Sequence, residues 1–441
     1  MIAEYFRFGE NKTDIKTEII AGITTFLAAM YIIIVNPSIL SQCGMPFNGV
    51  LTATVLVSLF STLMMGIYAK NPILVAPGMG LNAFFTFSVV LGMGVKWETA
   101  LGAVFWAGII FLLLSIFNIR TLIVKAIPKQ IRYAVAAGIG LFISLIGFVN
   151  ARFLIPSPAT IIQIGKMDAV TITFVAGLMI TSLLVIKKVN GALIIGIIIT
   201  TLLSIPIGRL YGNASAINSG IPQLVTWKGI MAYPDFSLLF RLDLIGSLKF
   251  SLFPVIFAIL FTDMFDSLST FVGVAEAANL IDKNGEPRNI KESLIVDAFA
   301  TTVAGVLGSS AGTAYIESAA GIEEGGRTGF TAVIAGLLFL PFIFFSPLLS
   351  VIPSVATSPA LVLVGVFMIR PVLKINWGQI DDAVPAFLAL ILIPFTYSIT
   401  QGIIWGFLSW TIIKVVMGKR EEITPMLIVI DIFSILALVN H

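Results

Sequence analysis

The chain has 441 residues, of which 58% are hydrophobic and 11% are charged, and its mean hydropathy is +1.04. An ordinary soluble domain carries about 25% charged residues, so this composition excludes a soluble globular protein and predicts an all-α polytopic membrane protein. The formal net charge of +3 predicts no nucleic-acid partner, and the lipid bilayer is the partner that the composition indicates.

Cysteine and histidine are nearly absent. The only cysteine is Cys43 and the only histidine is His441. A disulfide within the chain and a metal site of the usual His/Cys kind are therefore excluded. We predict no metal site and no cofactor, and any proton chemistry falls to carboxylates.

Apolar runs long enough to cross about 30 Å of hydrocarbon recur along the chain. After a charged lead-in at residues 1–16, which lacks the signal-peptide pattern, a first set of spans is predicted at 17–38, 49–68, 73–92, 99–117, 132–150, 169–186 and 191–208. A second set is predicted at 248–274, 292–308, 310–325, 328–347, 356–370, 383–399 and 402–417. These make about fourteen spans. The apolar segment 426–439 contains Asp431 and is predicted to lie at the membrane surface.

The distribution of basic residues predicts the orientation, because Lys and Arg beside spans collect on the cytoplasmic side. The segments predicted to lie outside hold few of the 26 Lys and Arg residues, namely Lys96, Arg152, Lys166, Arg209, Lys228, Arg241 and Lys249. Both termini are therefore predicted to be cytoplasmic.

A turn-rich connection at 209–247 separates the two sets of spans and would lie outside. Each set has an odd number of spans, so the second set begins on the opposite side of the membrane, as in an inverted-topology repeat. The predicted organisation is a first repeat at 1–208, the connection, a second repeat at 248–417, and a cytoplasmic or interfacial C-terminal segment at 418–441.

Three polar stretches interrupt the apolar sequence: MGLNAF at 79–84, TDMFDS at 262–267 and TAYIESAAG at 313–321. A bilayer makes buried amides and carboxylates costly, so their presence inside spans indicates a transport site. The sequence has no intramembrane His and no HExxH, GxSxG or GxxxxGK[ST] motif, which disfavours a membrane enzyme. We therefore predict a carrier.

The third and tenth predicted spans carry Gly and Pro where a continuous helix would be expected, at Pro72, Pro77, Gly78, Gly80, Gly308, Gly312 and Gly321. Interrupted segments at matching positions of two inverted halves point to a binding site near the bilayer midplane, built from extended pieces and half-helices. For any single Gly, close helix packing is an equally good interpretation. Asn82 and Glu317 lie in these two spans, and we predict that they face one cavity.

Asp263 and Asp266 are three residues apart in the eighth predicted span, so they share one face of a helix. Two carboxylates this close inside a membrane cannot both be comfortably ionised. This is the chemistry that a proton-coupled carrier needs, although one or both could instead bond to backbone groups. Asp263 could also hold a sodium ion together with backbone carbonyls.

The segments PGMGLNAFF, FTDMFDSLSTFVG and YIESAAGIEEGGRTG resemble the AzgA-type purine permeases of the nucleobase transporter superfamily. The segments occur in the expected order, and the resemblance covers essentially the whole chain. It implies a repeat of seven plus seven spans. The core would comprise the spans within 17–117 and 248–347, and the gate those within 132–208 and 356–417.

The resemblance also implies the site and the activity. Asn82, Asp263, Asp266 and Glu317 match residues needed for binding and transport, and Thr25, Gly80 and Ile316 complete the substrate-binding set that we predict. Glu317 would accept two N–H donors of a purine, and Asn82 would hold the complementary edge or orient Glu317. Asp263, Asp266 and Glu317 would couple transport to protons.

The substrates implied by the resemblance are adenine, guanine or hypoxanthine, carried inward by alternating access across a bacterial plasma membrane. A homodimer is an expectation that rests on the resemblance alone. The alternatives are a sodium-coupled nucleobase carrier and an anion carrier of the same architecture. A site for an anion, however, should contain a cationic side chain rather than the carboxylate of Glu317.

Overall fold

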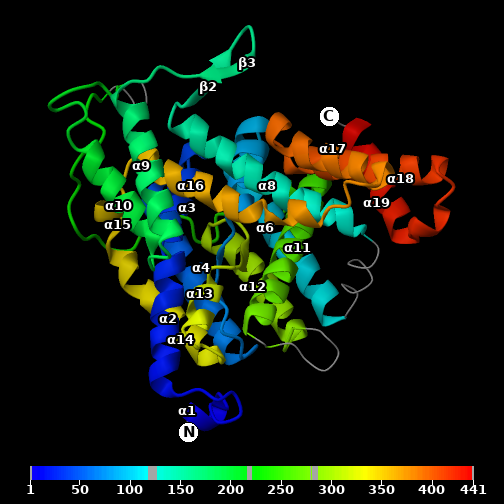
Figure 1. Cartoon of the computed structure of the whole chain (residues 1–441), viewed down its shortest axis with the longest axis horizontal. Coiled ribbons are helices and arrows are strands. Elements are labelled where there is room, and N and C mark those ends of the chain that lie inside the picture. Colours follow the sequence, from blue (N-terminus) through cyan, green and yellow to red (C-terminus); the bar gives the residue numbers. More distant parts are fainter. Residues whose placement is uncertain (1, 118–126, 216–220, 279, 281–286, 440–441) are drawn as a thin grey trace. The chain divides into compact units, whose positions relative to one another are not determined.

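The computed structural model describes residues 2–117, 127–215, 221–278, 280 and 287–439 and is mostly helical (Figure 1). His441 lies outside these residues. The chain forms two compact units. The first unit comprises Met1–Leu74, Ile143–Leu238 and Glu317–Val364, and the second comprises Val75–Phe142, Leu239–Ile316 and Gly365–His441.

The first unit is built around α14, which packs against both α2 and α4. Its helices are α1 (Ile2–Tyr5), α2 (Ile15–Ala29), α3 (Ile32–Leu40), α4 (Phe47–Ile67), α9 (Ala169–Ile186), α10 (Ala192–Ser204), α13 (Ser318–Glu323), α14 (Gly329–Phe339) and α15 (Ser346–Leu349), with short 3-10 turns at Ser41–Cys43 and Leu340–Phe344. A hairpin of β2 (Leu154–Ser157) and β3 (Ile161–Ile164) completes it.

The second unit contains α6 packed on α12, and α17 packed on α18. Its helices are α5 (Met79–Ala83), the π-helical segment η2 (Phe84–Gly92), α6 (Trp97–Ile116), α11 (Phe253–Ala278), α12 (Ile290–Leu307), α17 (Ile380–Thr396), α18 (Ile399–Val416) and α19 (Pro425–Val439), with 3-10 turns at Gly246–Leu248, Phe250–Leu252, Arg370–Lys374 and Arg420–Glu422. Two long helices, α8 (Lys129–Asn150) and α16 (Ser354–Met368), begin in one unit and end in the other.

Short extended pieces occur where the sequence predicts breaks. The strands β1 (Val75–Pro77) and β4 (Gly312–Ala314) pair antiparallel, with Ala76 opposite Thr313. All six strand residues are buried. Pro77 cannot donate a ladder hydrogen bond, so the pairing continues beyond it through the Gly78 N–H, which donates to the Ala311 carbonyl at 2.9 Å.

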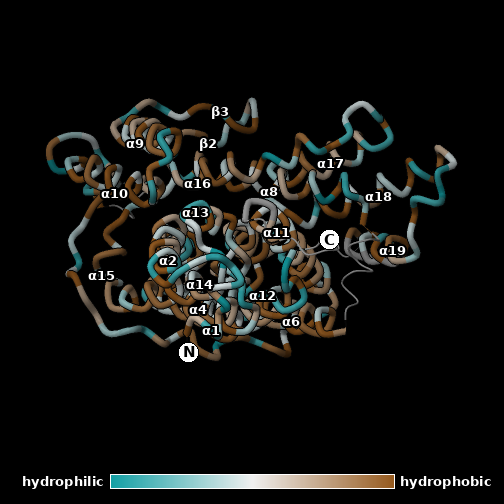
Figure 2. Tube along the Cα trace, turned by 60° about the horizontal axis from the view of Figure 1, so that its bottom comes forward, coloured by the Kyte–Doolittle hydropathy of each residue, from teal (hydrophilic) through white to brown (hydrophobic). Residues whose placement is uncertain are grey.

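Eight helical segments in the described part of the chain are long and apolar enough to cross a membrane: Ile15–Cys43, Phe47–Ile67, Trp97–Ile116, Lys129–Asn150, Ala169–Ile186, Phe250–Ala275, Ser354–Lys374 and Ile399–Val416. Shorter apolar helical segments occur at Met79–Gly92, Ala192–Ser204 and Gly329–Phe344. Hydrophobic residues predominate along the helices (Figure 2). A polytopic membrane protein is thereby confirmed, whereas the count of about fourteen spans stays a prediction.

The first predicted span, 17–38, is not one regular helix. It divides into α2 and α3, with a tight turn at Met30 and Tyr31 between them. In this turn the Ile33 N–H donates to the Met30 carbonyl and the Ile34 N–H to the Tyr31 carbonyl, both at 3.1 Å. Because these bonds join residues three apart, the helix tightens locally.

Candidate functional site

Close backbone approaches fix the region around the β1–β4 pair. A Cβ on Gly78 would lie 2.6 Å from Thr313 Cγ2, and one on Gly312 would lie 2.9 Å from the Ala300 Cβ. The Tyr315 hydroxyl donates to the Pro77 carbonyl at 2.5 Å. Only glycine fits at the two tight positions without displacing a neighbour.

Asn82 lies in α5, directly after β1, and is fully buried. Its Oδ1 accepts a hydrogen bond from the Ser310 hydroxyl. Its Nδ2 has no hydrogen-bond partner among the described residues. A buried amide with unused donors is costly. That Asn82 donates to a ligand stays a prediction.

Asp263, in α11, is also fully buried. Its Oδ2 contacts the Thr301 hydroxyl, and that hydroxyl also lies 2.9 Å from the Gly312 carbonyl. A hydroxyl has one proton and cannot donate to two acceptors at once. All three groups are satisfied together when Asp263 carries a proton and donates it to Thr301, which in turn donates to Gly312.

Asp266 shares the helix with Asp263 and interacts with it electrostatically, although Asp266 is only partly buried. A second fully buried carboxylate belongs to Asp297 of α12, which we did not predict as a site residue. Its charge interacts with those of Asp263 and Asp266. The sequence contained a signal, because Asp297 stands alone in the apolar stretch SLIVDAFA, where a bilayer makes a carboxylate costly.

Hydroxyl groups connect these carboxylates to β4. The Ser267 and Thr313 hydroxyl oxygens lie 2.7 Å apart, and the Ala314 N–H donates to the Ser267 Oγ at 3.2 Å. The second unit therefore contains a buried polar cluster around β4 that combines carboxylates, hydroxyls and the Asn82 amide.

Glu317 lies between β4 and α13, and it is the first residue of the part of the first unit that runs from Glu317 to Val364. Unlike Asp263, it is only partly buried. Its Oε1 accepts a hydrogen bond of 2.7 Å from the hydroxyl of Tyr31, a residue that we did not predict for the site. Glu317 belongs to the first unit whereas Asn82 and Asp263 belong to the second. That they face one cavity stays a prediction.

The remaining predicted binding residues have different surroundings. Thr25 is buried in α2, and its hydroxyl has no hydrogen-bond partner in the described part of the chain. Gly80 is buried, and a Cβ there would lie 2.4 Å from Ile139 Cγ2. Ile316 keeps 44% of its surface exposed beside Glu317. That Thr25, Gly80 and Ile316 contact the substrate stays a prediction.

A carboxylate on α2 binds the segment that leads into α14. Glu18 is fully buried, and its Oε1 accepts the backbone N–H groups of Arg327 and Thr328 at 2.9 and 3.2 Å. Its Oε2 accepts the Thr328 hydroxyl at 2.8 Å and both the N–H and the hydroxyl of Thr331 at 3.1 and 2.6 Å. Glu18 therefore caps α14 from another helix.

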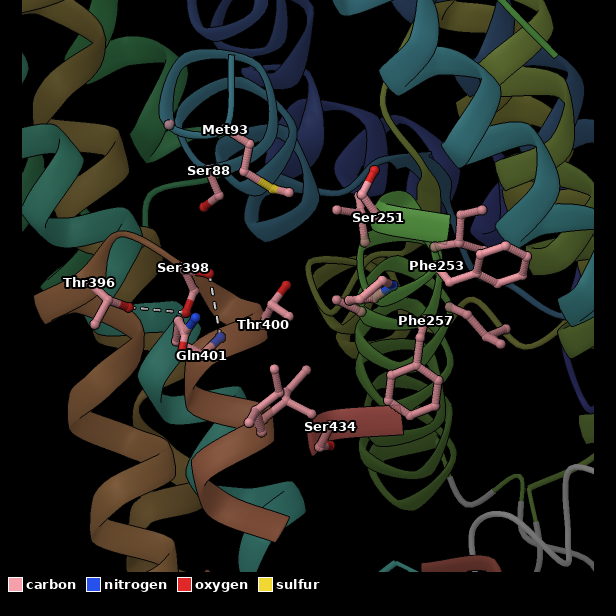
Figure 3. Close-up of a pocket in the computed structure, with 18 of the residues that line it drawn as sticks. Ser88, Met93, Ser251, Phe253, Phe257, Thr396, Ser398, Thr400, Gln401 and Ser434 are labelled. Atoms are coloured by element: carbon pink, nitrogen blue, oxygen red, sulfur yellow. Dashed lines mark hydrogen bonds between the residues drawn. The ribbon is translucent and has the colours of Figure 1, made fainter. Parts of the chain in front are cut away.

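A cavity of about 960 Å³ lies in the second unit, among residues of η2, α6, α11, α17, α18 and α19. Its lining is mostly apolar, and its polar side chains include those of Ser88, Ser398 and Gln401 (Figure 3). The Gln401 N–H donates to the Ser398 Oγ at 3.4 Å. Neither Asn82 nor Asp263 lines this cavity, so it is distinct from the buried polar cluster.

Comparison with known proteins places this geometry in a family. The chain is 38% identical over 440 residues to the adenine permease AdeP of Escherichia coli (strain K12), covering 100% of this chain and 96% of that protein. It is 40% identical over 439 residues to the guanine/hypoxanthine permease PbuO of Bacillus subtilis (strain 168), covering 98% and 99%.

The fold is similar to that of the transmembrane domain of a cyanobacterium bicarbonate transporter, BicA. The TM-score is 0.62 and the sequence identity 15%, covering 89% of this chain and 97% of that domain. Residues 16–404 match the model of the Permease family, Xan_ur_permease. The chain therefore belongs to this permease family and is a transporter rather than an enzyme.

Proposed function

We propose that this permease carries purine nucleobases, namely adenine, guanine or hypoxanthine, into the cell by alternating access. The relatives named as adenine and guanine/hypoxanthine permeases support this proposal, because they align with nearly the whole chain at about 40% identity. A purine presents ring and exocyclic N–H donors beside acceptors. A carboxylate such as Glu317 and an amide such as Asn82 together complement that pattern.

The observation that carries the site assignment is the partial exposure of Glu317, a carboxylate that follows the buried strand β4 by three residues. A carboxylate in this place can be reached by a ligand. Glu317→Gln should weaken purine binding by about 1.5–3 kcal/mol, because a neutral amide replaces an ionised acceptor. Wild-type affinity of the purified variant would exclude this role.

Uptake tests the substrate. Cells lacking their own purine permeases and expressing this chain should accumulate radiolabelled adenine or hypoxanthine, and unlabelled bases should compete in an order that gives the preferred substrate. Absence of uptake of all three purines by protein that reaches the membrane would overturn the proposal.

We also propose that transport is coupled to protons through Asp263, with Asp266 and Glu317 contributing. The contact of one Thr301 hydroxyl with two acceptors, Asp263 and the Gly312 carbonyl, supports a protonated Asp263. Sodium coupling is the second candidate, because the Asp263 Oδ1 has no hydrogen-bond partner among the described residues and could bind a cation. Acidification of the proteoliposome lumen during purine entry in sodium-free buffer would support proton coupling. Purine uptake that requires sodium and occurs without proton movement would support sodium coupling.

For the architecture, we propose about fourteen spans in a seven-plus-seven inverted repeat, with core and gate domains and both termini cytoplasmic. The pairing of β1 with β4 supports it, because each strand precedes one of two short helices from distant parts of the sequence. Similarity to the bicarbonate transporter supports the fold alone and gives no reason to assign an anion substrate.

A further inference from the structure

Tyr31 occupies an unusual place in the first unit. It lies in the turn between α2 and α3, and only 1% of its surface is exposed. A buried tyrosine hydroxyl needs a hydrogen-bond partner, and here the hydroxyl donates to Glu317 Oε1 at 2.7 Å, across 286 positions of sequence. A hydrogen bond to an ionised carboxylate is short and strong, and it restricts the direction in which the carboxylate points.

The backbone beneath Glu317 is held by separate contacts. The Leu74 N–H donates to the Ser318 hydroxyl oxygen at 3.0 Å. A Cβ on Gly321 would lie 2.0 Å from Thr25 Oγ1 and 2.4 Å from the Ala21 carbonyl oxygen, so α13 is in very close contact with α2. These contacts fix the main chain of α13. The Glu317 side chain is restrained separately, by the hydrogen bond from the Tyr31 hydroxyl and by one from its own backbone N–H.

A carboxylate has about four acceptor positions on its two oxygens, and Tyr31 uses one of them. Glu317 keeps partial exposure, so acceptor positions remain for a ligand. If Tyr31 were absent, the side chain would sample several rotamers, and binding would have to overcome that conformational entropy.

We propose that Tyr31 is a positioning residue for substrate binding, which holds the Glu317 carboxylate in the orientation that accepts the N–H donors of a planar nucleobase. The proposal rests on the proposed function of the chain and on the assignment of Glu317. The alternative role of Tyr31 is structural, in which its hydroxyl only ties the turn between α2 and α3 to α13.

A double-mutant cycle separates these roles. Equilibrium binding of labelled adenine and hypoxanthine is measured with purified wild type, Tyr31→Phe, Glu317→Gln and the double variant. Tyr31→Phe should weaken binding about ten- to a hundred-fold in the wild-type background, as expected for loss of a hydrogen bond to a charged group. In the Glu317→Gln background it should weaken binding less than about three-fold.

Tyr5→Phe is the matched control. Its hydroxyl donates to the Ile67 carbonyl at 2.9 Å in the same unit, so this variant also loses one tyrosine hydrogen bond but should bind purines as the wild type does. Equal losses from Tyr31→Phe in both backgrounds, or wild-type binding by Tyr31→Phe, would overturn the proposal. Failure of the wild type itself to bind any purine would overturn the proposed function instead, and the role of Tyr31 with it.

A variant that keeps the donor provides an independent measurement if Tyr31→Phe does not fold. 4-Aminophenylalanine at position 31 retains an N–H donor close to the hydroxyl position and should bind purines within about three-fold of the wild type. A ten-fold or larger loss by this folded variant would contradict the positioning role.

Discussion

The Glu18 carboxylate accepts both the backbone N–H and the hydroxyl of Thr331, although the two residues are 313 positions apart in the sequence. Glu18 lies on α2 and Thr331 in the first turn of α14. The first turn of a helix leaves N–H groups without partners inside the helix, and a negative charge there is favourable. This contact therefore fixes α14 against α2.

Glu18→Gln should lower the stability of the purified protein by about 2 kcal/mol or more, because an ionised acceptor of several hydrogen bonds in a buried place is replaced by an amide with one acceptor oxygen. The midpoint of thermal unfolding in detergent measures the effect. Glu10→Gln is the control, since Glu10 pairs with Arg7 at 3.6 Å on the exposed surface and such pairs contribute little. Equal midpoints for Glu18→Gln and Glu10→Gln would show that the cap does not stabilise the fold.

Several parts of the fold could be predicted from the sequence. The extended pieces at β1 and β4 follow from Pro77, Gly78 and Gly312, since proline and glycine interrupt helices. The interpretation of Gly321 as a helix break was wrong, because it lies inside α13 and allows close packing on α2.

Other features depend on contacts that no local pattern contains. The pairing of Tyr31 with Glu317 joins residues 286 positions apart, and periodicity does not indicate which buried tyrosine meets which carboxylate. Asp297 differs, because a lone carboxylate within an apolar span is visible in the sequence. It was missed because the pair Asp263 and Asp266 already accounted for the expected proton chemistry.

Gly321→Ala should destabilise the protein by about 1–3 kcal/mol, the usual cost of adding a methyl group to a filled space. The new Cβ would lie 2.0 Å from Thr25 Oγ1 and 2.4 Å from the backbone oxygen of Ala21, which cannot move aside without shifting α2. Thermal unfolding in detergent gives the stability change. Gly9→Ala should leave the midpoint nearly unchanged, because no heavy atom lies within 4 Å of a Cβ there. A midpoint for Gly321→Ala as high as that for Gly9→Ala would contradict the close packing.

Asp263→Asn should abolish concentrative uptake while retaining exchange of internal for external purine. An asparagine cannot release a proton, so the empty carrier would lack the step that couples its return to the proton gradient, whereas exchange proceeds with substrate bound in both directions. Entry of labelled purine into proteoliposomes loaded with unlabelled purine measures exchange, and entry into proteoliposomes without internal purine measures concentrative uptake. Asp14→Asn should preserve both, because Asn also caps the start of a helix and Asp14 caps α2 with bonds of 2.9 and 3.1 Å. Concentrative uptake by Asp263→Asn would remove Asp263 from proton coupling.

A cluster of charged side chains makes the effect of acid on the stability of the fold testable. It lies where α17 begins, ahead of the span predicted at 383–399. Lys414 Nζ is 2.7 Å from both Asp381 Oδ2 and Asp382 Oδ1, and Lys419 Nζ is 2.6 Å from Asp381 Oδ2. The hydrogen bond from Lys414, followed by the one from Lys419, lowers the pKa of Asp381 to about 2.

The sign of the pH dependence follows from this lowered pKa. The unfolded chain should bind a proton at Asp381 with a pKa of about 3.9, so the ionised carboxylate stabilises the fold fully above that pH and loses this effect as the pH falls towards 2. Asp381→Asn should therefore lower the unfolding midpoint by a constant amount between about pH 7 and pH 5, and by progressively less below about pH 4. Unfolding of both proteins in detergent across this range measures the difference. A difference that is unchanged at about pH 3, or that grows in acid, would contradict the stabilising pairing of ionised Asp381 with Lys414.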